Sequence, residues 1–184
     1  MAQDWIWHGG RPCLDLVNTL RERWSAAPRE LLVAPADLAG WLQAAQLVDG
    51  VPEVGPALLA AARELREAID RVLRNERPRV EDVALVDAWA RRAVPPPARL
   101  RLDETGRLHA DLPPPADGAE LALAVLAADA VALVAGGARA QVRVCAHERC
   151  GLRFVDRSPA HNRQWCSMRR CGNRAKASRH HARR

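Results

Sequence analysis

The stretch CSMRRCGNRAKASRHHARR, from Cys166 to Arg184, decides how this chain is organised, because two cysteines are followed directly by a cluster of arginines. A second pair, in CAHERC from Cys145 to Cys150, repeats the Cys-x4-Cys spacing, and 15 residues separate the two pairs. Two close pairs joined by a moderate loop can converge on one metal ion, and thiolates favour Zn²⁺ or, less often, an iron–sulfur cluster. We therefore predict a zinc site made of Cys145, Cys150, Cys166 and Cys171.

The surroundings of these cysteines favour a metal over other means of stabilisation. The segment has too few large apolar residues to bury a core by itself. Disulfides are the rival, but the opening MAQDWIWHGG lacks the features of an export signal, so we expect a reducing cytoplasm. Alternative ligands are histidines that lack the symmetry of the cysteine pairs: His147, His161, His180 and His181. The fifth cysteine, Cys13, is expected to be a small buried residue, with a redox sensor as the alternative.

Charge is distributed very unevenly along the 184 residues. Residues 1–138 carry 15 basic and 20 acidic side chains, whereas residues 139–184 carry 13 basic and 2 acidic ones. An acidic body with a strongly basic end is typical of a folded domain joined to an element that binds a polyanion. The alternative is a basic tail that only confers solubility.

A helix beginning at Ser167 would separate small residues from basic ones. Cys171, Ala175, Ser178 and Ala182 would share one face toward the metal, at 100° per residue. The remaining arc would be free to contact phosphates and base edges, giving salt-sensitive binding to nucleic acid. The candidate DNA contacts are Arg163, Arg169, Arg170, Asn173, Arg174, Lys176, Arg179, His180 and Arg183.

The first 138 residues have the periodicity of a mostly helical domain. Apolar residues recur every three to four positions in segments 12–24, 35–46, 56–74 and 81–93. Apolar and polar residues then alternate in ARLRLDETGRLHADLP, which predicts one β-hairpin. Asp117 and Glu120 have the spacing of an acidic variant of the capping box, which predicts the start of a further helix. Gly136 and Gly137 end that helix as a hinge. We expect an α+β fold with domains 1–138 and 139–184, the second a small zinc module ending in a basic helix.

The most apolar segment, LALAVLAADAVALVA from Leu121 to Ala135, is too short to span a membrane and contains Asp129. We predict a buried helix and no membrane partner. The tryptophans before the zinc module lie among periodic apolar positions, and we assign them to the core, with the wall of an aromatic pocket as the alternative: Trp5, Trp7, Trp24, Trp41 and Trp89.

The C-terminal motif resembles the CGNR zinc-finger family, because WCSM from Trp165 is followed by CGNR from Cys171. GGRPCLDLVNTL from Gly9 and ADLAGWL from Ala36 resemble the ABATE domain that precedes that finger. The resemblance implies a bacterial transcription regulator, with a ligand-binding N-terminal domain and a zinc-bound, DNA-binding C-terminus. Its four cysteine ligands fall on the two Cys-x4-Cys pairs. Pro12 and Ala34 are the departures from the body pattern.

We do not expect this protein to be an enzyme, since none of the common catalytic motifs occurs and a zinc ion bound by four thiolates has no open coordination position. The expected partners are duplex DNA and an unidentified small-molecule effector, and a homodimer is compatible with the sequence. The alternatives to DNA binding are that the protein binds RNA or the ribosome, or that the zinc module binds another protein. The candidate effector contacts are Trp7, Arg11, Asp15 and Asn18, although such polar residues more often brace a helix end.

Overall fold

The computed structural model describes residues 5–74, 77–93, 99–111 and 118–181. Its α-helices are α1 (Pro12–Val17), α2 (Pro35–Ala44), α3 (Pro56–Arg74), α4 (Val80–Ala90), α5 (Ala119–Ala135) and α6 (Asn173–His181). A 3-10 helix, η1 (Ala138–Gln141), and a π-helix, η2 (Met168–Gly172), complete the helical elements. The strands form antiparallel pairs: β1 (Leu20–Arg21) with β2 (Arg29–Glu30), β3 (Arg99–Leu102) with β4 (Leu108–Asp111), and β5 (Val142–Val144) with β6 (Arg153–Val155). The predicted α+β class is confirmed.

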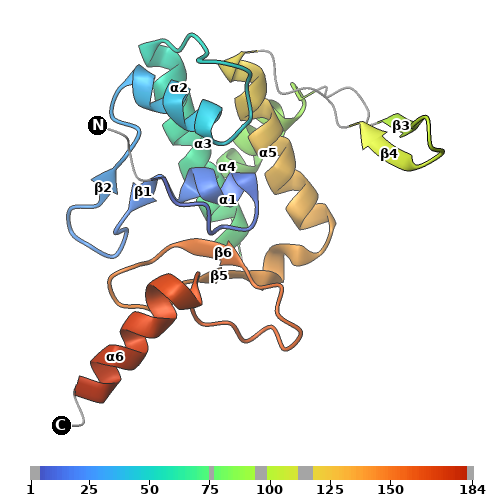
Figure 1. Ribbon diagram of the computed structural model, residues 1–184. Coiled ribbons are helices and arrows are strands. Elements are labelled where there is room, and N and C mark those ends of the chain that lie inside the picture. Colours follow the sequence, from blue (N-terminus) through green and yellow to red (C-terminus); the bar gives the residue numbers. More distant parts are fainter. Residues whose placement is uncertain (1–4, 75–76, 94–98, 112–117, 182–184) are drawn as a thin grey trace.

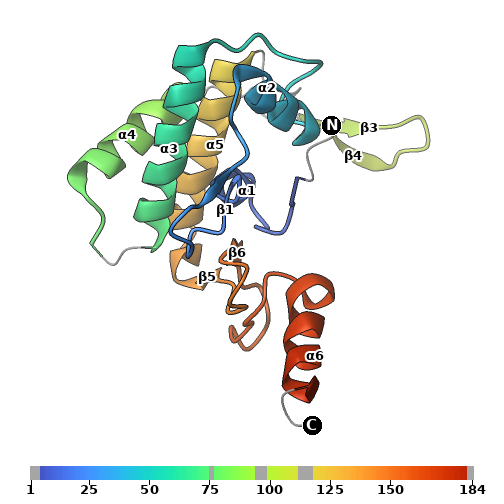
Figure 2. The same cartoon turned by 90° about the vertical axis from the view of Figure 1, so that its left-hand side faces the viewer.

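The core of the body lies between α1, α3, α4 and α5, which pack together in Figures 1 and 2. The apolar stripe of α3 is buried through Leu59, Ala62, Leu65 and Ile69. Helix α5 buries most of its apolar residues, as predicted from its composition, but Val131 and Val134 near its C-terminal end are exposed. Among the described helices, none combines the length and apolar character needed to cross a bilayer.

The prediction of one helix over residues 12–24 is wrong, because α1 ends at Val17. The buried Asn18 side chain leaves the helix and pairs with the Arg153 backbone, donating to its carbonyl at 2.9 Å and accepting its N–H at 2.8 Å. The chain then forms β1 and turns at Glu22, whose φ is 54°. Side-chain hydrogen bonds of this kind compete with helix formation.

The other helices agree with the prediction to within a few residues. Helix α2 ends at Ala44, close to Gln46, whose φ of 57° lies outside the helical region. Helix α3 has the predicted range and α4 spans Val80–Ala90 instead of 81–93. The predicted capping residue Asp117 lies outside the described residues, and the N-cap of α5 is Gly118.

The assignment of every tryptophan to the core is wrong at two positions. Trp41 and Trp89 are buried and Trp5 is half-buried against the core. Trp7 and Trp24 expose 42% and 54% of their surface. Trp7 still contacts Trp41, with ring centroids 5.8 Å apart. Trp24 follows β1 in the turn that replaces the predicted helix, so it cannot reach the core.

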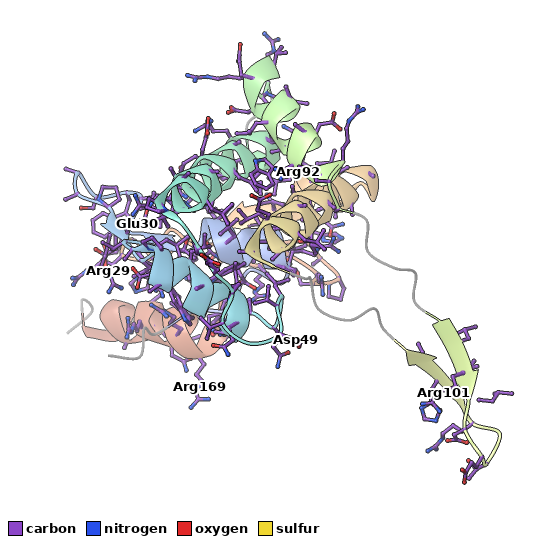
Figure 3. All side chains as sticks on the ribbon, turned by 90° about the horizontal axis from the view of Figure 1, so that it is seen from above. Arg29, Glu30, Asp49, Arg92, Arg101 and Arg169 are labelled. Atoms are coloured by element: carbon purple, nitrogen blue, oxygen red, sulfur yellow. The ribbon has the colours of Figure 1, made fainter. Side chains whose placement is uncertain are left out.

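The predicted hairpin is present as β3 and β4, with Leu100 opposite Ala110 and Leu102 opposite Leu108. It stands away from the helices in Figures 1 and 3. Its leucines Leu100, Leu102 and Leu108 are all more than 60% exposed. The hairpin therefore does not contribute to the core of the body.

The C-terminal module is fixed on the body although two glycines precede it. The Arg153 side chain is buried and donates from Nε and Nη2 to the two carboxylate oxygens of Asp70, at 2.8 and 3.0 Å. The Val155 N–H donates to the Gly9 carbonyl at 2.9 Å. Burial acts to raise the pKa of Asp70, but hydrogen bonds from Arg153 and Arg74 overcome it and lower that pKa. Gly136 and Gly137 end α5, and the contacts of Arg153 and Val155 then hold the module against the body.

We expect Asp70→Asn to reduce the free energy of unfolding at pH 7 by about 3 kcal/mol or more, because it leaves Arg153 buried without its anion. Urea unfolding measures this change. The contribution of Asp70 should be fully present above its ordinary pKa of 3.8 and should fade as the pH falls through its lower folded-state value.

The matched control is Asp87→Asn, which removes an exposed pair with Arg91. This variant should change the free energy of unfolding by only about 0.5 kcal/mol. Equal stability of the two variants would show that the Asp70–Arg153 pair does not hold the module on the body.

Candidate metal centre and nucleic-acid interface

Four cysteine sulfurs from the two predicted pairs meet in the C-terminal module. The Sγ atoms of Cys145, Cys150, Cys166 and Cys171 all lie within 4.8 Å of one another. The Cys150–Cys166 and Cys166–Cys171 distances are 3.7 and 3.8 Å. A tetrahedral ion with Zn–S bonds of about 2.3 Å requires sulfurs about 3.8 Å apart, whereas a disulfide requires about 2.05 Å. The arrangement therefore fits a zinc ion and excludes the rival disulfides among these cysteines.

Short structural elements place each sulfur. Cys145 directly follows β5, and its N–H donates to the Leu152 carbonyl at 2.8 Å. Cys150 ends a tight turn, donating to the His147 carbonyl at 3.0 Å. Cys171 lies in η2, where the N–H groups of Cys171 and Gly172 both donate to the Ser167 carbonyl. The predicted helix from Ser167 thus begins as a π-turn.

The surroundings of the sulfurs are apolar and braced by Arg163. Phe154 is fully buried beside the cysteines, with Leu152 and Ile6 in the same cluster. The Arg163 guanidinium lies 4.8 Å from the Phe154 ring and donates to the carbonyls of Trp165, at 2.8 Å, and of Cys166. Arg163 is one of the candidate DNA contacts; the residue is exposed, and its guanidinium lies on the backbone of the cysteine loop.

The electrostatics of the four thiols favour a cation at their centre. Hydrogen bonds from Cys150 and Cys166 lower the pKa of Cys145. The hydrogen bond to Cys145 raises the pKa of Cys166. Burial is the main reason why the pKa of Cys171 is raised to about 12. Four adjacent thiols therefore cannot all ionise unless a cation neutralises them.

The alternative ligands do not join this group within the described residues. The Nδ1 atom of His147 accepts the Arg149 N–H at 3.2 Å, and Nδ1 of His161 lies 3.1 Å from the Asp156 carbonyl. The side chains of His180 and His181 are not described. Cys13 is fully buried in the body, as expected, and burial raises its pKa.

The basic helix extends from the cysteine centre away from the body, as Figures 1 and 2 show. Arg169, Asn173, Arg174 and Lys176 are exposed and Arg170 is half-buried. On the small-residue face, Cys171 is buried and Ala175 half-buried. The remaining predicted residues have undescribed side chains (Ser178, Arg179, His180) or lie outside the described residues (Ala182, Arg183).

Many arginines of the body are neutralised by carboxylates, for example Arg66 by Glu30 and Arg71 by Asp82, both at 2.6 Å. In the module, Arg153 is likewise paired with Asp70. Among the described residues, no ion pair involves the guanidinium groups of four other arginines of the module: Arg149, Arg169, Arg170 and Arg174. Unpaired positive charge is therefore concentrated around η2 and α6.

The four candidate effector contacts mostly bind other parts of the protein. Arg11 pairs with Asp129 at 2.6 Å. Asp15 accepts the Gly9 N–H at 2.8 Å, and burial raises its pKa to about 6. Asn18 is hydrogen-bonded to the Arg153 backbone, and the ring of the exposed Trp7 contacts the ring of Trp41. The structure thus gives these side chains bracing contacts within the protein.

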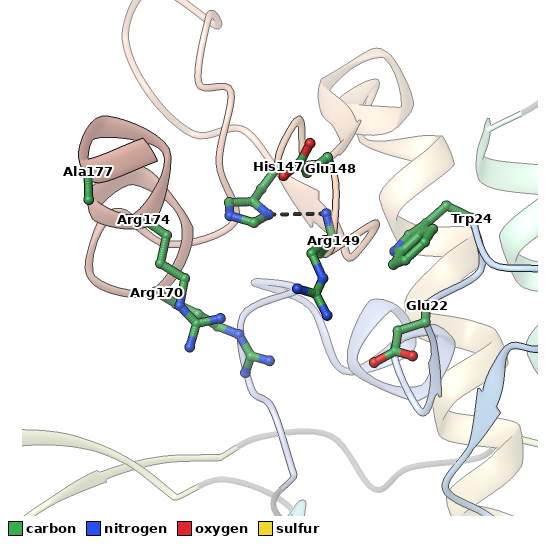
Figure 4. Close-up of a pocket in the computed structure, with 8 residues that line it drawn as sticks. All are labelled: Glu22, Trp24, His147, Glu148, Arg149, Arg170, Arg174 and Ala177. Carbon is green, nitrogen blue, oxygen red and sulfur yellow. Dashed lines mark hydrogen bonds between the residues drawn. The ribbon is translucent and has the colours of Figure 1, made fainter. Parts of the chain in front are cut away.

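A cleft that the sequence did not indicate lies between the body and the module. It has a volume of about 640 Å³ and is lined from the body by Glu22 and Trp24. Figure 4 shows the module's lining residues opposite them, among them His147, Arg149, Arg170 and Arg174. We call it the junction cleft. Its place could not be expected from the sequence, because the apolar periodicity assigns Trp24 to a core helix; a tryptophan in a pocket wall was the alternative interpretation.

Comparison with known families gives two matches. A family described as "ABATE: Putative stress-induced transcription regulator" matches residues 10–137, and the CGNR zinc finger matches residues 141–184. No curated protein matches the chain. Both resemblances drawn from the sequence are confirmed, and with the four clustered cysteines the finger match identifies Zn²⁺ as the cofactor.

We expect the purified protein to hold about one zinc ion per chain, because the four sulfurs form one tetrahedral set. Elemental analysis should find that Cys171→Ser loses most of the metal. The matched control, Cys13→Ala, changes the cysteine outside the cluster and should keep it. Zinc retained by Cys171→Ser, or iron in place of zinc, would contradict this assignment.

Proposed function

This chain belongs to the ABATE family and ends in a CGNR zinc finger, and on that basis we propose that it is a transcription regulator whose finger binds duplex DNA. The observation that carries the proposal is the unpaired positive charge around η2 and α6, on a helix that projects from the body. Guanidinium groups without a protein carboxylate are available to phosphates.

The geometry suits a helix in a major groove. The B-DNA major groove is about 12 Å wide, close to the diameter of an α-helix with its side chains. Arg170, Arg174 and Lys176 would contact phosphates, and Asn173, in the first turn of α6, would face base edges. Cys171 would hold the start of the helix through the metal.

Duplex DNA is favoured over RNA for a physical reason. The major groove of A-form RNA is deep and narrow and does not admit a helix in this way. The family description also refers to transcription. RNA binding and a protein-interaction role remain outcomes that the binding measurements below distinguish.

The proposal describes a binding protein and not an enzyme. Four thiolates complete the coordination of zinc, so the ion keeps no open position for a substrate or an activated water. Free thiols at every described cysteine suit a reducing cytoplasm.

We expect Arg170→Ala/Arg174→Ala to weaken binding to all duplex sequences and to lower the slope of log K against log salt by about two, because each arginine neutralises about one phosphate. Fluorescence anisotropy with labelled duplex DNA at several salt concentrations measures both. Zinc content is checked first, because Arg170 adjoins Cys171.

The matched control is Arg91→Ala/Arg92→Ala, which removes the same charge from the end of α4. It should leave the salt slope unchanged. If the finger variant keeps its zinc and binds as tightly as the parent, the DNA-binding role of this face is wrong. Tighter binding to RNA than to DNA would favour the RNA alternative.

We expect Asn173→Ala to act differently from the arginine variants. Removing a base-edge hydrogen bond should reduce the preference for the best duplex over a random one by about 1–3 kcal/mol and leave the salt slope unchanged. A uniform decrease in affinity for both duplexes would place Asn173 on the phosphate backbone instead.

A further inference from the structure

The junction cleft is large enough for a small molecule and is charged. Its volume of about 640 Å³ lies within the range of about 300–1,000 Å³ that is usual for ligand sites. The guanidinium groups of Arg149, Arg170 and Arg174 point into it in Figure 4. Among the described residues these three groups have no ion pair, so an anion could neutralise them.

The body supplies an aromatic wall. Trp24 exposes 54% of its surface and lies against the finger at Gly151. A Cβ on Gly151 would lie 3.3 Å from Cδ1 of Trp24, and Gly151 has a φ of 67° that favours glycine. The backbone of the finger thus leaves room for the indole, whose ring can stack on a planar group.

A carboxylate faces the arginines across the same cleft. Glu22 has a φ of 54°, which is uncommon for a residue other than glycine or asparagine. Backbone strain of this kind is concentrated at functional positions. Figure 4 shows the Glu22 carboxylate on the opposite side of the cleft from Arg170 and Arg174. It can accept hydrogen bonds from a ligand.

The contacts of Arg153 fix the position of the two sides of the cleft relative to each other. This residue of β6 is hydrogen-bonded through its backbone to Asn18 and through its side chain to Asp70. The cleft is therefore formed before any ligand arrives, which reduces the entropic cost of binding.

We propose that the junction cleft binds a mononucleotide. Its phosphate would lie among Arg149, Arg170 and Arg174, its base would stack on Trp24, and an amino or hydroxyl donor would bind Glu22. Because Arg170 and Arg174 are also proposed DNA contacts, the bound nucleotide would compete with DNA. Only this competition rests on the proposed function.

The test uses the zinc-loaded full chain without DNA. Isothermal titration calorimetry with adenosine 5′-monophosphate, adenosine and inorganic pyrophosphate separates the contributions of ring and charge. The monophosphate should bind at least tenfold more tightly than either of the other two. Absence of binding at millimolar concentration, or equal binding of monophosphate and pyrophosphate, would overturn the proposal.

Two variants outside the proposed DNA contacts sharpen the test. Trp24→Leu and Glu22→Gln should each weaken binding of the monophosphate about tenfold, with zinc content and thermal unfolding unchanged. The control Trp7→Leu removes another exposed tryptophan, one that does not line the cleft, and should bind as the parent does. Unchanged affinity in both cleft variants would contradict the proposal.

Competition is measured separately. Monophosphate at about ten times the parent's Kd should weaken anisotropy-detected DNA binding about tenfold in the parent but only about twofold in Trp24→Leu. If the protein binds the nucleotide in calorimetry but binds no DNA, the proposed function fails and the cleft assignment stands. If it binds DNA but not the nucleotide, the cleft assignment fails and the proposed function stands.

Discussion

The contact on which the rest of the structure depends is the buried pairing of Arg153 with Asp70 and Asn18. A charged residue of the finger enters the body, where Asp70 neutralises its guanidinium and the Asn18 side chain binds its backbone N–H and carbonyl. A buried arginine is costly unless each of these partners is present. The docking geometry is therefore specific, and it determines the direction in which α6 leaves the body.

The zinc centre adds a second constraint, which is local to the finger. Residues 139–184 carry a net charge of +11, and such a segment repels itself unless something holds it together. Four thiolates around a cation supply that cohesion, and Arg163 supports it by capping the carbonyls of the cysteine loop. Because these groups hold the fold, the outward arginines need no protein partner and stay available to a polyanion.

The sequence predicts this structure well where local spacing determines it. The Cys-x4-Cys pairs specified the sulfur cluster, and the apolar stripe of α3 specified its helix and its buried face. Prediction failed where a distant contact overrides local preference. Asn18 continues a helical pattern in the sequence, but it binds Arg153, which is 135 residues away, so α1 stops. Trp24 was consequently misassigned to the core.

Together these contacts connect the body to the finger, so that a ligand at the junction cleft would lie next to the proposed DNA-binding face. The central claim is that the finger, and not the helical body, contacts DNA. Hydrogen–deuterium exchange of the zinc-loaded chain with and without duplex DNA tests it most directly. The account predicts slower exchange in residues 168–181 on DNA binding and no change in α3 or α4. Protection confined to the body, with residues 168–181 unaffected, would contradict it.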